Sequence, residues 1–192
     1  MEFLEVINTR RSTREFSIEP ISKNMVKCLI DSARLAPSAK NRQNWIYVVL
    51  EKDKKDNVAN IMLKEYQKET AKMECDNATL PHRAASSVLN SIRVIKEAPI
   101  LILVFRKYDK DWTEGDFLSI GASIENLCLR ATDLELATLW IRDVIYTREE
   151  ITNAIFDKDK SVELISGVAV GYSTEFPYER KKKKLEDIMI WM

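Results

Sequence analysis

The segment TRRSTREF, residues 9–16, gathers three arginines and three hydroxyl side chains within eight residues. Guanidinium groups and hydroxyls hold phosphates and carboxylates through charge-assisted hydrogen bonds. Because the whole chain has 30 basic and 30 acidic residues, this positive charge is a local feature, and it predicts an anion site. The competing interpretation is that Arg10 and Arg11 end a helix, where cations favour the helix dipole, and that Arg14 is a solvated charge.

A second polar segment, LAPSAKNRQNW, begins at Leu35. It places Ser38, Asn41, Gln43 and Asn44 within seven positions, directly after a proline that stops a helix. Amide and hydroxyl side chains in a loop can hydrogen-bond a polar heterocycle. An ordinary Asn/Ser turn has the same composition, so this loop is a candidate ligand-binding segment that needs a second signal.

The glycines limit how a phosphate can be held. None of the four glycines stands in the spacing of a Rossmann fingerprint or of a P-loop. Both of these backbone phosphate sites are therefore excluded. A bound phosphate must be held by side chains, of the kind that TRRSTR supplies.

The histidine and the cysteines exclude other chemistries. His82 is the single histidine, so a Ser-His-Asp triad or a multi-histidine metal site lacks its residues, and we expect His82 on the surface. Cys28, Cys75 and Cys128 lie far apart without a C-x-x-C pair. We expect reduced, mostly buried thiols and no metal site.

The composition is that of one globular domain. The chain has 192 residues, of which 45% are hydrophobic, enough for a single core. The opening MEFLEVINTR lacks the basic and apolar regions of a signal peptide, and the longest apolar run, APILILVF, is too short to span a bilayer. We expect a cytoplasmic protein without membrane segments. The RKKKK run lacks interleaved aromatic residues, so no nucleic-acid partner is expected.

The hydrophobic pattern predicts the elements that must position these segments. Helical periodicity marks residues 3–8, 22–36, two segments within 54–96, 115–136 and 147–156. Ser22 is expected to cap the second helix, and Thr147 with Glu150 to form a capping box for the last. Strands are predicted over residues 44–50, 99–105, 137–141 and 162–172, the second being apolar on both faces and therefore central. Helices that flank strands without strict alternation favour an α+β fold with a mixed sheet.

The two polar segments, in this order, resemble the nitroreductase-like family of NADH oxidases and flavin reductases. That family opens with R-R-S-x-R-x-F followed by A-P-S-x-x-N-x-Q-P-W. The resemblance continues in GASIENLCLRATDLELATLWI, which is similar to the family's dimer helix and following strand, and in GVAVGY with RKKKKLEDIM near the end. Residues 52–91 have no visible counterpart.

The resemblance implies the architecture. Residues 1–192 would form a single FMN-binding domain whose central sheet is mixed, mainly antiparallel and flanked by helices. The protein would be an intertwined homodimer, with residues 185–192 packing on the partner subunit. The plain alternative is that this apolar tail packs on its own domain.

The resemblance also implies the cofactor site. The FMN phosphate and ribityl chain would meet residues near the amino terminus and in the basic tail, the ring would be lined by the partner's loop, and backbone donors would approach N5 and O4. The phosphate and ribityl contacts would be Arg10, Arg11, Ser12, Arg14, Lys181, Lys182 and Lys183. The ring would be lined by the partner's Pro37, Ser38, Ala39 and Asn41, with Gln43 supporting that loop. The backbone donors would be those of Ile141 and Arg142. No catalytic side chain is assigned, because flavin N5 would carry the hydride.

The implied activity is ping-pong hydride transfer from NADH or NADPH through FMN to a nitroaromatic, a quinone or an enone. The chain departs from the family where Asn44 replaces a proline, and where residues near the flavin edge, Glu135, Ala137, Arg142 and Asp143, replace glycines. The changes at Glu135 and Arg142 leave a non-catalytic flavin-binding dimer as an alternative. A flavin-fragmenting or dehalogenating member of the same family is a further alternative. The residue that faces flavin N1 and O2 stays open between Asn90, Arg93 and Lys96.

Overall fold

The computed structural model describes residues 1–75, 82–175 and 178–192, with residues 74–75 and 82–85 described by their backbone alone. It contains a four-stranded sheet and six α-helices in that part of the chain. The strands are β1 (Ile46–Glu51), β2 (Ile100–Lys107), β3 (Ala137–Ile141) and β4 (Val162–Gly171). The helices are α1 (Phe3–Thr9), α2 (Lys23–Ala33), α3 (Lys52–Cys75), α4 (His82–Glu97), α5 (Thr113–Asp133) and α6 (Arg148–Phe156).

The sheet has the order β1-β2-β4-β3, with β2 and β4 in the centre. Every strand pairing in the described chain is antiparallel, so the expected mixed sheet is corrected to an antiparallel one. Among the described residues, the one parallel contact is an isolated bridge between Ser12 and Thr138. The α+β class is confirmed.

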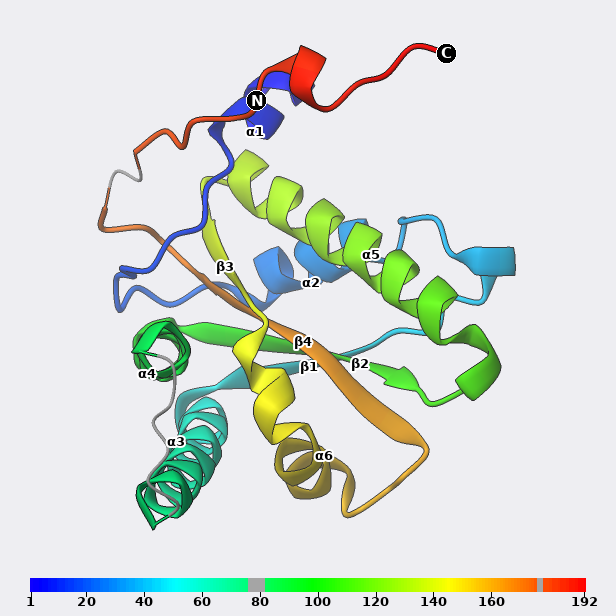
Figure 1. Cartoon of the computed structure of the whole chain (residues 1–192). Coiled ribbons are helices and arrows are strands. Elements are labelled where there is room, and N and C mark those ends of the chain that lie inside the picture. Colours follow the sequence, from blue (N-terminus) through cyan, green and yellow to red (C-terminus); the bar gives the residue numbers. More distant parts are fainter. Residues whose placement is uncertain (76–81, 176–177) are drawn as a thin grey trace.

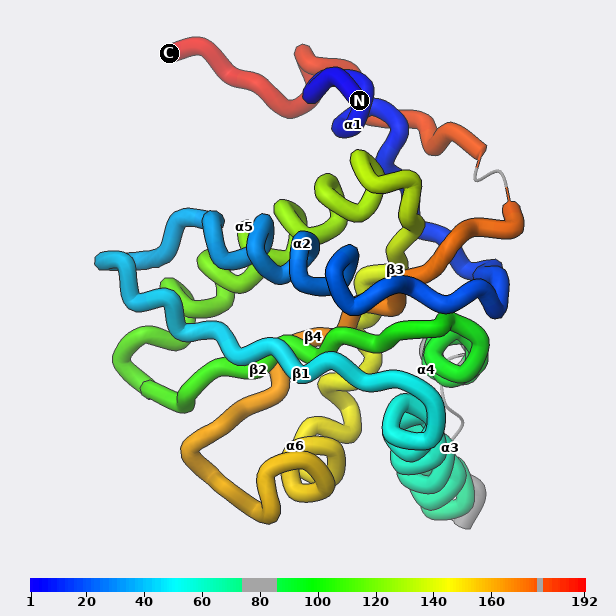
Figure 2. Tube along the Cα trace, turned by 180° about the vertical axis from the view of Figure 1, so that it is seen from behind, coloured from blue at the N-terminus to red at the C-terminus, as the bar shows by residue number. Residues whose placement is uncertain are grey.

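The sheet is covered on both faces (Figures 1 and 2). Successive side chains of β2 point to opposite sides. Ile100, Ile102 and Val104 pack with residues of α2 and α5, whereas Leu101 and Leu103 pack with residues of α3, α4 and α6. Burial on both faces explains why this strand reads as an unbroken apolar run.

The helix boundaries confirm most of the hydrophobic pattern and correct two details. Ser22 caps α2 as expected, since its Oγ accepts from the Met25 N–H at 3.2 Å. The capping box predicted at Thr147 is wrong, because the Thr147 side chain makes no capping hydrogen bond at the start of α6; its hydroxyl donates to the Val144 carbonyl. In α1 only Val6 is buried; the rest of its predicted apolar stripe is exposed.

The cysteine prediction is half correct. Cys128 is buried and Cys28 is exposed, and both thiols are free. Burial raises the Cys128 pKa from 9.0 to about 11. The side chains of Cys75 and His82 lie outside the described residues.

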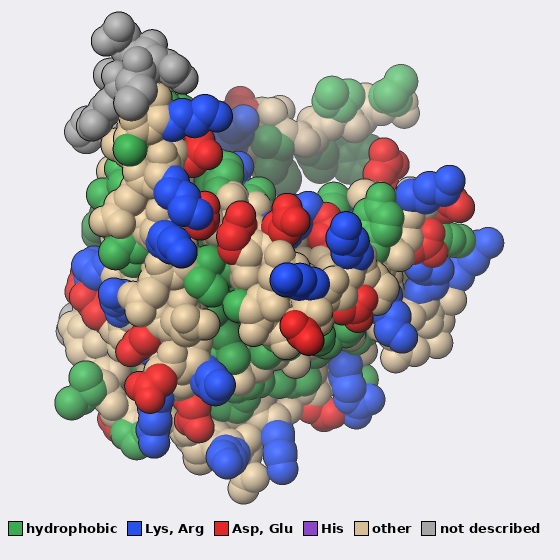
Figure 3. Space-filling view, turned by 90° about the horizontal axis from the view of Figure 1, so that it is seen from below, with side chains coloured by type: hydrophobic (Ala, Val, Ile, Leu, Met, Phe, Trp, Pro, Cys, Tyr) green, Lys and Arg blue, Asp and Glu red, His purple; other side chains and the backbone are tan. Residues whose placement is uncertain are grey.

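Charged side chains of both signs are interspersed over the face of the molecule shown in Figure 3. The neutral balance of the sequence therefore also holds over that surface. A cationic site must come from a local cluster. The amino terminus lies beyond the carboxyl end of α5, the short turn Leu185–Asp187 of the tail lies next to α1, and the chain then extends away from it (Figures 1 and 2). The tail after residue 185 is exposed.

Candidate functional site

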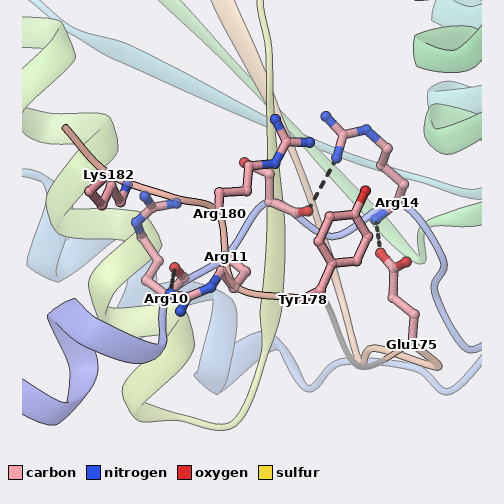
Figure 4. Close-up of a pocket in the computed structure, with 8 residues that line it drawn as sticks. Arg10, Arg11, Arg14, Glu175, Tyr178, Arg180 and Lys182 are labelled. Atoms are coloured by element: carbon pink, nitrogen blue, oxygen red, sulfur yellow. Dashed lines mark hydrogen bonds between the residues drawn. The ribbon is translucent and has the colours of Figure 1, made fainter.

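A cavity of about 490 Å³ lies where the amino-terminal segment meets the basic tail (Figure 4). Its volume is in the range of small-molecule sites. Five of the residues that line it are cationic and one is acidic, so the cavity is strongly positive within a neutral chain. The lining residues are Arg10, Arg11, Ser12, Arg14, Glu175, Tyr178, Arg180 and Lys182.

The edge of the sheet positions the arginine segment. The Thr13 N–H donates to the Thr138 carbonyl of β3 at 3.0 Å, and Thr13 is buried while Ser12 is exposed. Further on, the Ser17 N–H donates to the Tyr172 carbonyl at 2.9 Å. These backbone bonds hold the segment along the sheet and leave the alternate side chains, Ser12 and Arg14, on the cavity side.

The arginines keep donors for a ligand. Arg10 Nε lies 3.3 Å from a Glu125 carboxylate oxygen of α5. Arg11 Nη1 donates to the Arg10 carbonyl at 2.9 Å, and Arg14 Nη1 donates to the Ser12 carbonyl at 3.3 Å. Each guanidinium has more N–H groups than these contacts use. The segment is therefore held in place with spare charge-assisted donors.

One carboxylate is part of the same cavity. A Glu175 carboxylate oxygen accepts from the Arg14 backbone N–H at 2.7 Å (Figure 4). Glu175 thus fixes the backbone of Arg14 and leaves the Arg14 guanidinium to other partners. Sequence reasoning missed Glu175 and Tyr178, which carry no motif of their own.

The basic tail contributes alternate residues. Arg180 and Lys182 line the cavity, whereas the expected Lys181 and Lys183 do not. Sequence reasoning missed Arg180. The signal that could have found it is the two-residue spacing to Lys182, because alternate residues of a chain that crosses a site can face the same side.

The second polar segment lies against the start of α5, around the 3₁₀ turn Ala39–Asn41. The Ala39 N–H donates to Ser119 Oγ at 3.2 Å, and the Gln43 N–H donates to Ser38 Oγ at 3.0 Å. Asn41 and Gln43 have positive φ angles of 55° and 47°. Such φ angles are uncommon outside glycine, so the surrounding contacts must hold the loop in this shape.

A buried ionic network anchors the end of that loop. Asn44 Nδ2 donates to the Asp116 carboxylate at 2.7 Å and to the Lys107 carbonyl at 2.8 Å. Arg42 Nε lies 3.5 Å from the same carboxylate, and Arg106 Nη1 lies 3.4 Å from it. Asp116 is 2% exposed. Asn44, which departs from the family's proline, therefore ties the loop to β2 and α5.

Within a single chain, the arginine segment (residues 9–16) and the polar loop (residues 35–45) lie apart from each other. The loop contacts α5 at Ser119 and beside Gly115, whereas Arg10 contacts Glu125. Gly115 and Glu125 are separated by roughly 15 Å along a helix. Figure 1 shows the loop and α1 at opposite ends of α5. Accordingly, none of the expected residues Pro37, Ser38, Ala39, Asn41 and Gln43 lines the cationic cavity.

The unexpected side chains after β3 are held by partners within their own chain. Ile141 is buried and pairs with Gly167. The Arg142 guanidinium lies 5.4 Å from the centre of the Tyr146 ring and bonds its hydroxyl. The Asp143 carboxylate points inward and accepts from two serine hydroxyls of α4, Ser87 at 2.7 Å and Ser91 at 2.8 Å.

Of the three candidates on α4, Arg93 contacts the arginine segment, and Asn90 contacts Arg93. Arg93 Nη2 lies 2.9 Å from a Glu15 carboxylate oxygen and donates to the Asn90 side chain at 3.1 Å. The hydrogen bond with Glu15 raises the Arg93 pKa. Lys96 instead lines a separate cavity with Lys55.

The described residues do not meet the requirements of a metal site or of a membrane-spanning helix. They contain no group of three or more histidine, cysteine, aspartate or glutamate side chains that could hold a metal ion. None of their helices is long and apolar enough to cross a bilayer.

Comparison with known families identifies the class. The Nitroreductase family model matches residues 7–172, so the chain belongs to the nitroreductase family. The match includes the arginine segment, the strand β3 that lies beside it, and the polar loop.

Individual relatives agree with this assignment. A 4-nitrobenzoate reductase from Pseudomonas putida is 26% identical over 205 residues, which cover 91% of this chain and 86% of the relative. The crystal structure of a BluB-like flavoprotein from Clostridium difficile 630 superposes with a TM-score of 0.81 at 25% identity, covering 100% of this chain and 99% of the other. An FMN- and NADPH-dependent nitroreductase from a Sphigopyxis strain shares the fold, with a TM-score of 0.78 at 15% identity over 100% and 99% of the two chains.

Proposed function

We propose that the protein is an FMN-dependent NAD(P)H oxidoreductase that works as a homodimer and reduces a small acceptor, such as a nitroaromatic, a quinone or an enone. The observation that carries the proposal is the cationic cavity, which is lined by side chains and not by a glycine-rich backbone loop. Membership of the nitroreductase family, and relatives named as a flavoprotein and as an FMN- and NADPH-dependent enzyme, support the choice of cofactor.

The donor set fits a flavin phosphate. Arg10, Ser12 and Arg14 supply guanidinium and hydroxyl donors from one side of the cavity, and Arg180 and Lys182 supply positive charge from the tail. In this proposal Arg11 completes the amino-terminal side. Glu175 stabilises the site indirectly, through the Arg14 backbone.

The strand β3 joins this phosphate site to the proposed ring site. Thr138 lies beside Ser12, and Ile141 is three residues further along the same edge strand, a separation of about 10 Å. In this proposal the backbone at Ile141 and Arg142 faces the reactive edge of the ring. Arg93, which donates to the Arg14 carbonyl, and Asn90, which accepts from Arg93, are the α4 groups proposed to face its pyrimidine end.

A second subunit completes the proposed site. The loop with Ser38, Asn41 and Gln43 lies away from its own chain's cavity, so we assign it, with Pro37 and Ala39, to the flavin of the partner. Exposed apolar side chains support this association, since large ones are rarely left open on a monomer. They include Phe3, Leu4, Leu35, Leu118, Ile190 and Trp191.

The protein's part in the reaction is binding and orientation. When bound, FMN supplies a two-electron carrier that accepts a hydride from a nicotinamide and passes it to the second substrate. Arg93 would place positive charge near the pyrimidine end, where negative charge develops on reduction. Its ion pair with Glu15 fixes the position of that charge.

The test is an anaerobic titration of the purified protein. We expect a yellow protein whose flavin absorbance bleaches with NADH or NADPH and recovers on addition of a nitroaromatic or a quinone. Bound FMN that a nicotinamide fails to reduce would favour the non-catalytic flavin-binding dimer, the alternative raised by Arg142 at the strand edge. Protein that takes up no FMN would contradict both.

A further inference from the structure

A second cavity, of about 390 Å³, lies between α3, α4, α6 and the 3₁₀ turn Asp143–Thr147. It is built largely on the helical pair that has no counterpart in the family motifs. The cavity shares no lining residue with the cationic site. Its occupant must therefore be inferred from its own chemistry.

The apolar part of this cavity is aromatic and sulfur-rich. Met62 is 1% exposed and forms part of the core, while Tyr66, Met73 and Val88 are half-buried beside it. Tyr146 completes the wall. Methionine side chains adapt to ligands of different shape and make favourable contacts with aromatic rings. Such a surface suits a compact hydrophobic or aromatic body.

The charged part of the cavity has one sign. Its titratable carboxylates come from α3, from α6 and from the turn after β3, and no lysine or arginine is among the lining residues whose side chains the structure describes. Two of these carboxylates are already engaged, since Glu65 pairs with Lys68 at 2.5 Å and Asp143 accepts from serines of α4. Glu69 and Glu150 have no hydrogen-bond or ion-pair partner in the part of the chain that the structure describes.

Tyr66 and Tyr146 differ in whether a cation of the protein already lies against the ring. Tyr146 already meets the guanidinium of Arg142. Tyr66 has no such cation among the described contacts and lies one helical turn from Glu69 on α3. A free aromatic face beside an unpaired carboxylate attracts a positive group by both charge and cation–π interaction.

We propose that this cavity binds a small organic cation with an apolar or aromatic body. Its ammonium group lies toward Glu69 and Glu150, and its body packs on Tyr66, Met62 and Met73. Charge complementarity selects this ligand class over neutral or anionic molecules of the same size. The proposal does not depend on the flavin, so it stands or falls independently of the proposed reaction.

The test is calorimetric titration of the purified, full-length protein with three probes of similar size: benzyltrimethylammonium, benzyl alcohol and phenylacetate. We expect the cation to bind at least tenfold more tightly than the other two. Its affinity should fall as salt is added, because the carboxylates lie near the surface. Equal affinities for the three probes, or no heat from the cation up to millimolar concentration, would overturn the proposal.

Matched variants locate the site. Glu69→Gln with Glu150→Gln should weaken binding of the cation by about tenfold, from two charge interactions of modest size. Asp53→Asn with Glu149→Gln removes the same net charge from exposed positions on the same two helices, outside the cavity, and should change the affinity less than twofold. Tyr66→Leu should weaken binding severalfold, whereas Tyr66→Phe keeps the aromatic face and the affinity. An equal loss in the control pair would place the cation elsewhere.

Discussion

The side-chain amide of Asn44 donates to the buried carboxylate of Asp116 at 2.7 Å. The same side chain also bonds both backbone groups of Lys107, donating to its carbonyl at 2.8 Å and accepting from its N–H at 3.2 Å. A residue that looks like a minor departure from the family motif thus joins the polar loop to the end of β2. This position has a structural role that proline cannot fill, because proline has no side-chain amide.

Asn44→Ala should destabilise the fold by about 1–3 kcal/mol, because it removes partners from a buried carboxylate and from strand-end backbone groups. Urea unfolding followed by circular dichroism measures this change. Asn24→Ala, at an exposed position of α2, is the control and should change stability by less than about 0.5 kcal/mol. Equal stability of the two variants would mean that the Asn44 bonds contribute nothing net.

The elements of the fold could be predicted because their signals are local. The apolar run of β2 and the helical stripe of α5 are readable in the residues themselves, and both elements appear near the expected positions. The predicted cap at Thr147 did not form, because its hydroxyl oxygen accepts no N–H from the first turn of α6, although the same hydroxyl donates to the Val144 carbonyl. Side-chain hydroxyls have several local partners, and sequence alone does not rank them.

The residues of the cationic cavity could be predicted from the sequence only where they belong to a recognisable motif. TRRSTR indicated the arginines of the cavity, whereas Arg180 and Glu175 reach it through the path of the chain after β4. The inward orientation of Asp143 depends on serines that lie more than 50 residues earlier. Such pairings belong to tertiary structure, and no local pattern reports them.

Two glycines offer a sharp contrast. A Cβ added at Gly171 would lie 2.7 Å from both Phe16 and the ring of Pro99, whereas one added at Gly121 would meet only Trp140, at 3.9 Å. Gly171→Ala should destabilise the protein by about 1–3 kcal/mol through overpacking. Gly121→Ala, in the middle of α5, should be neutral or stabilising by up to about 1 kcal/mol. Thermal unfolding of both variants checks this, and the reverse order would contradict the packing at Phe16.

Cys128 predicts a loss of stability at high pH. Burial raises its pKa from 9.0 to about 11, so between these values the unfolded chain releases a proton that the folded chain keeps. Stability should therefore be unaffected by this thiol below about pH 9 and should fall as the pH rises toward 11. Denaturant unfolding from pH 8 to 11 measures the slope, and Cys128→Ala should make it shallower. An unchanged slope would mean that the thiol is not protected.

The basic tail allows a comparison between neighbours. Lys182→Ala should weaken FMN binding severalfold, because Lys182 lines the cationic cavity, whereas Lys183→Ala should leave the affinity nearly unchanged. Fluorescence titration of flavin-free protein with FMN measures both. Equal losses would indicate a diffuse charge effect and would contradict the specific placement of Lys182.

The central claim is that the cavity at Arg10, Ser12 and Arg14 binds the phosphate of FMN, and the most direct test compares FMN with riboflavin, which lacks that phosphate. The unaltered protein should bind FMN at least about 100-fold more tightly than riboflavin, since several charge-assisted bonds are at stake. Arg10→Ala with Ser12→Ala should reduce this ratio by at least tenfold while changing riboflavin affinity little. A ratio near one in the unaltered protein, or the same ratio in the double variant, would contradict the assignment.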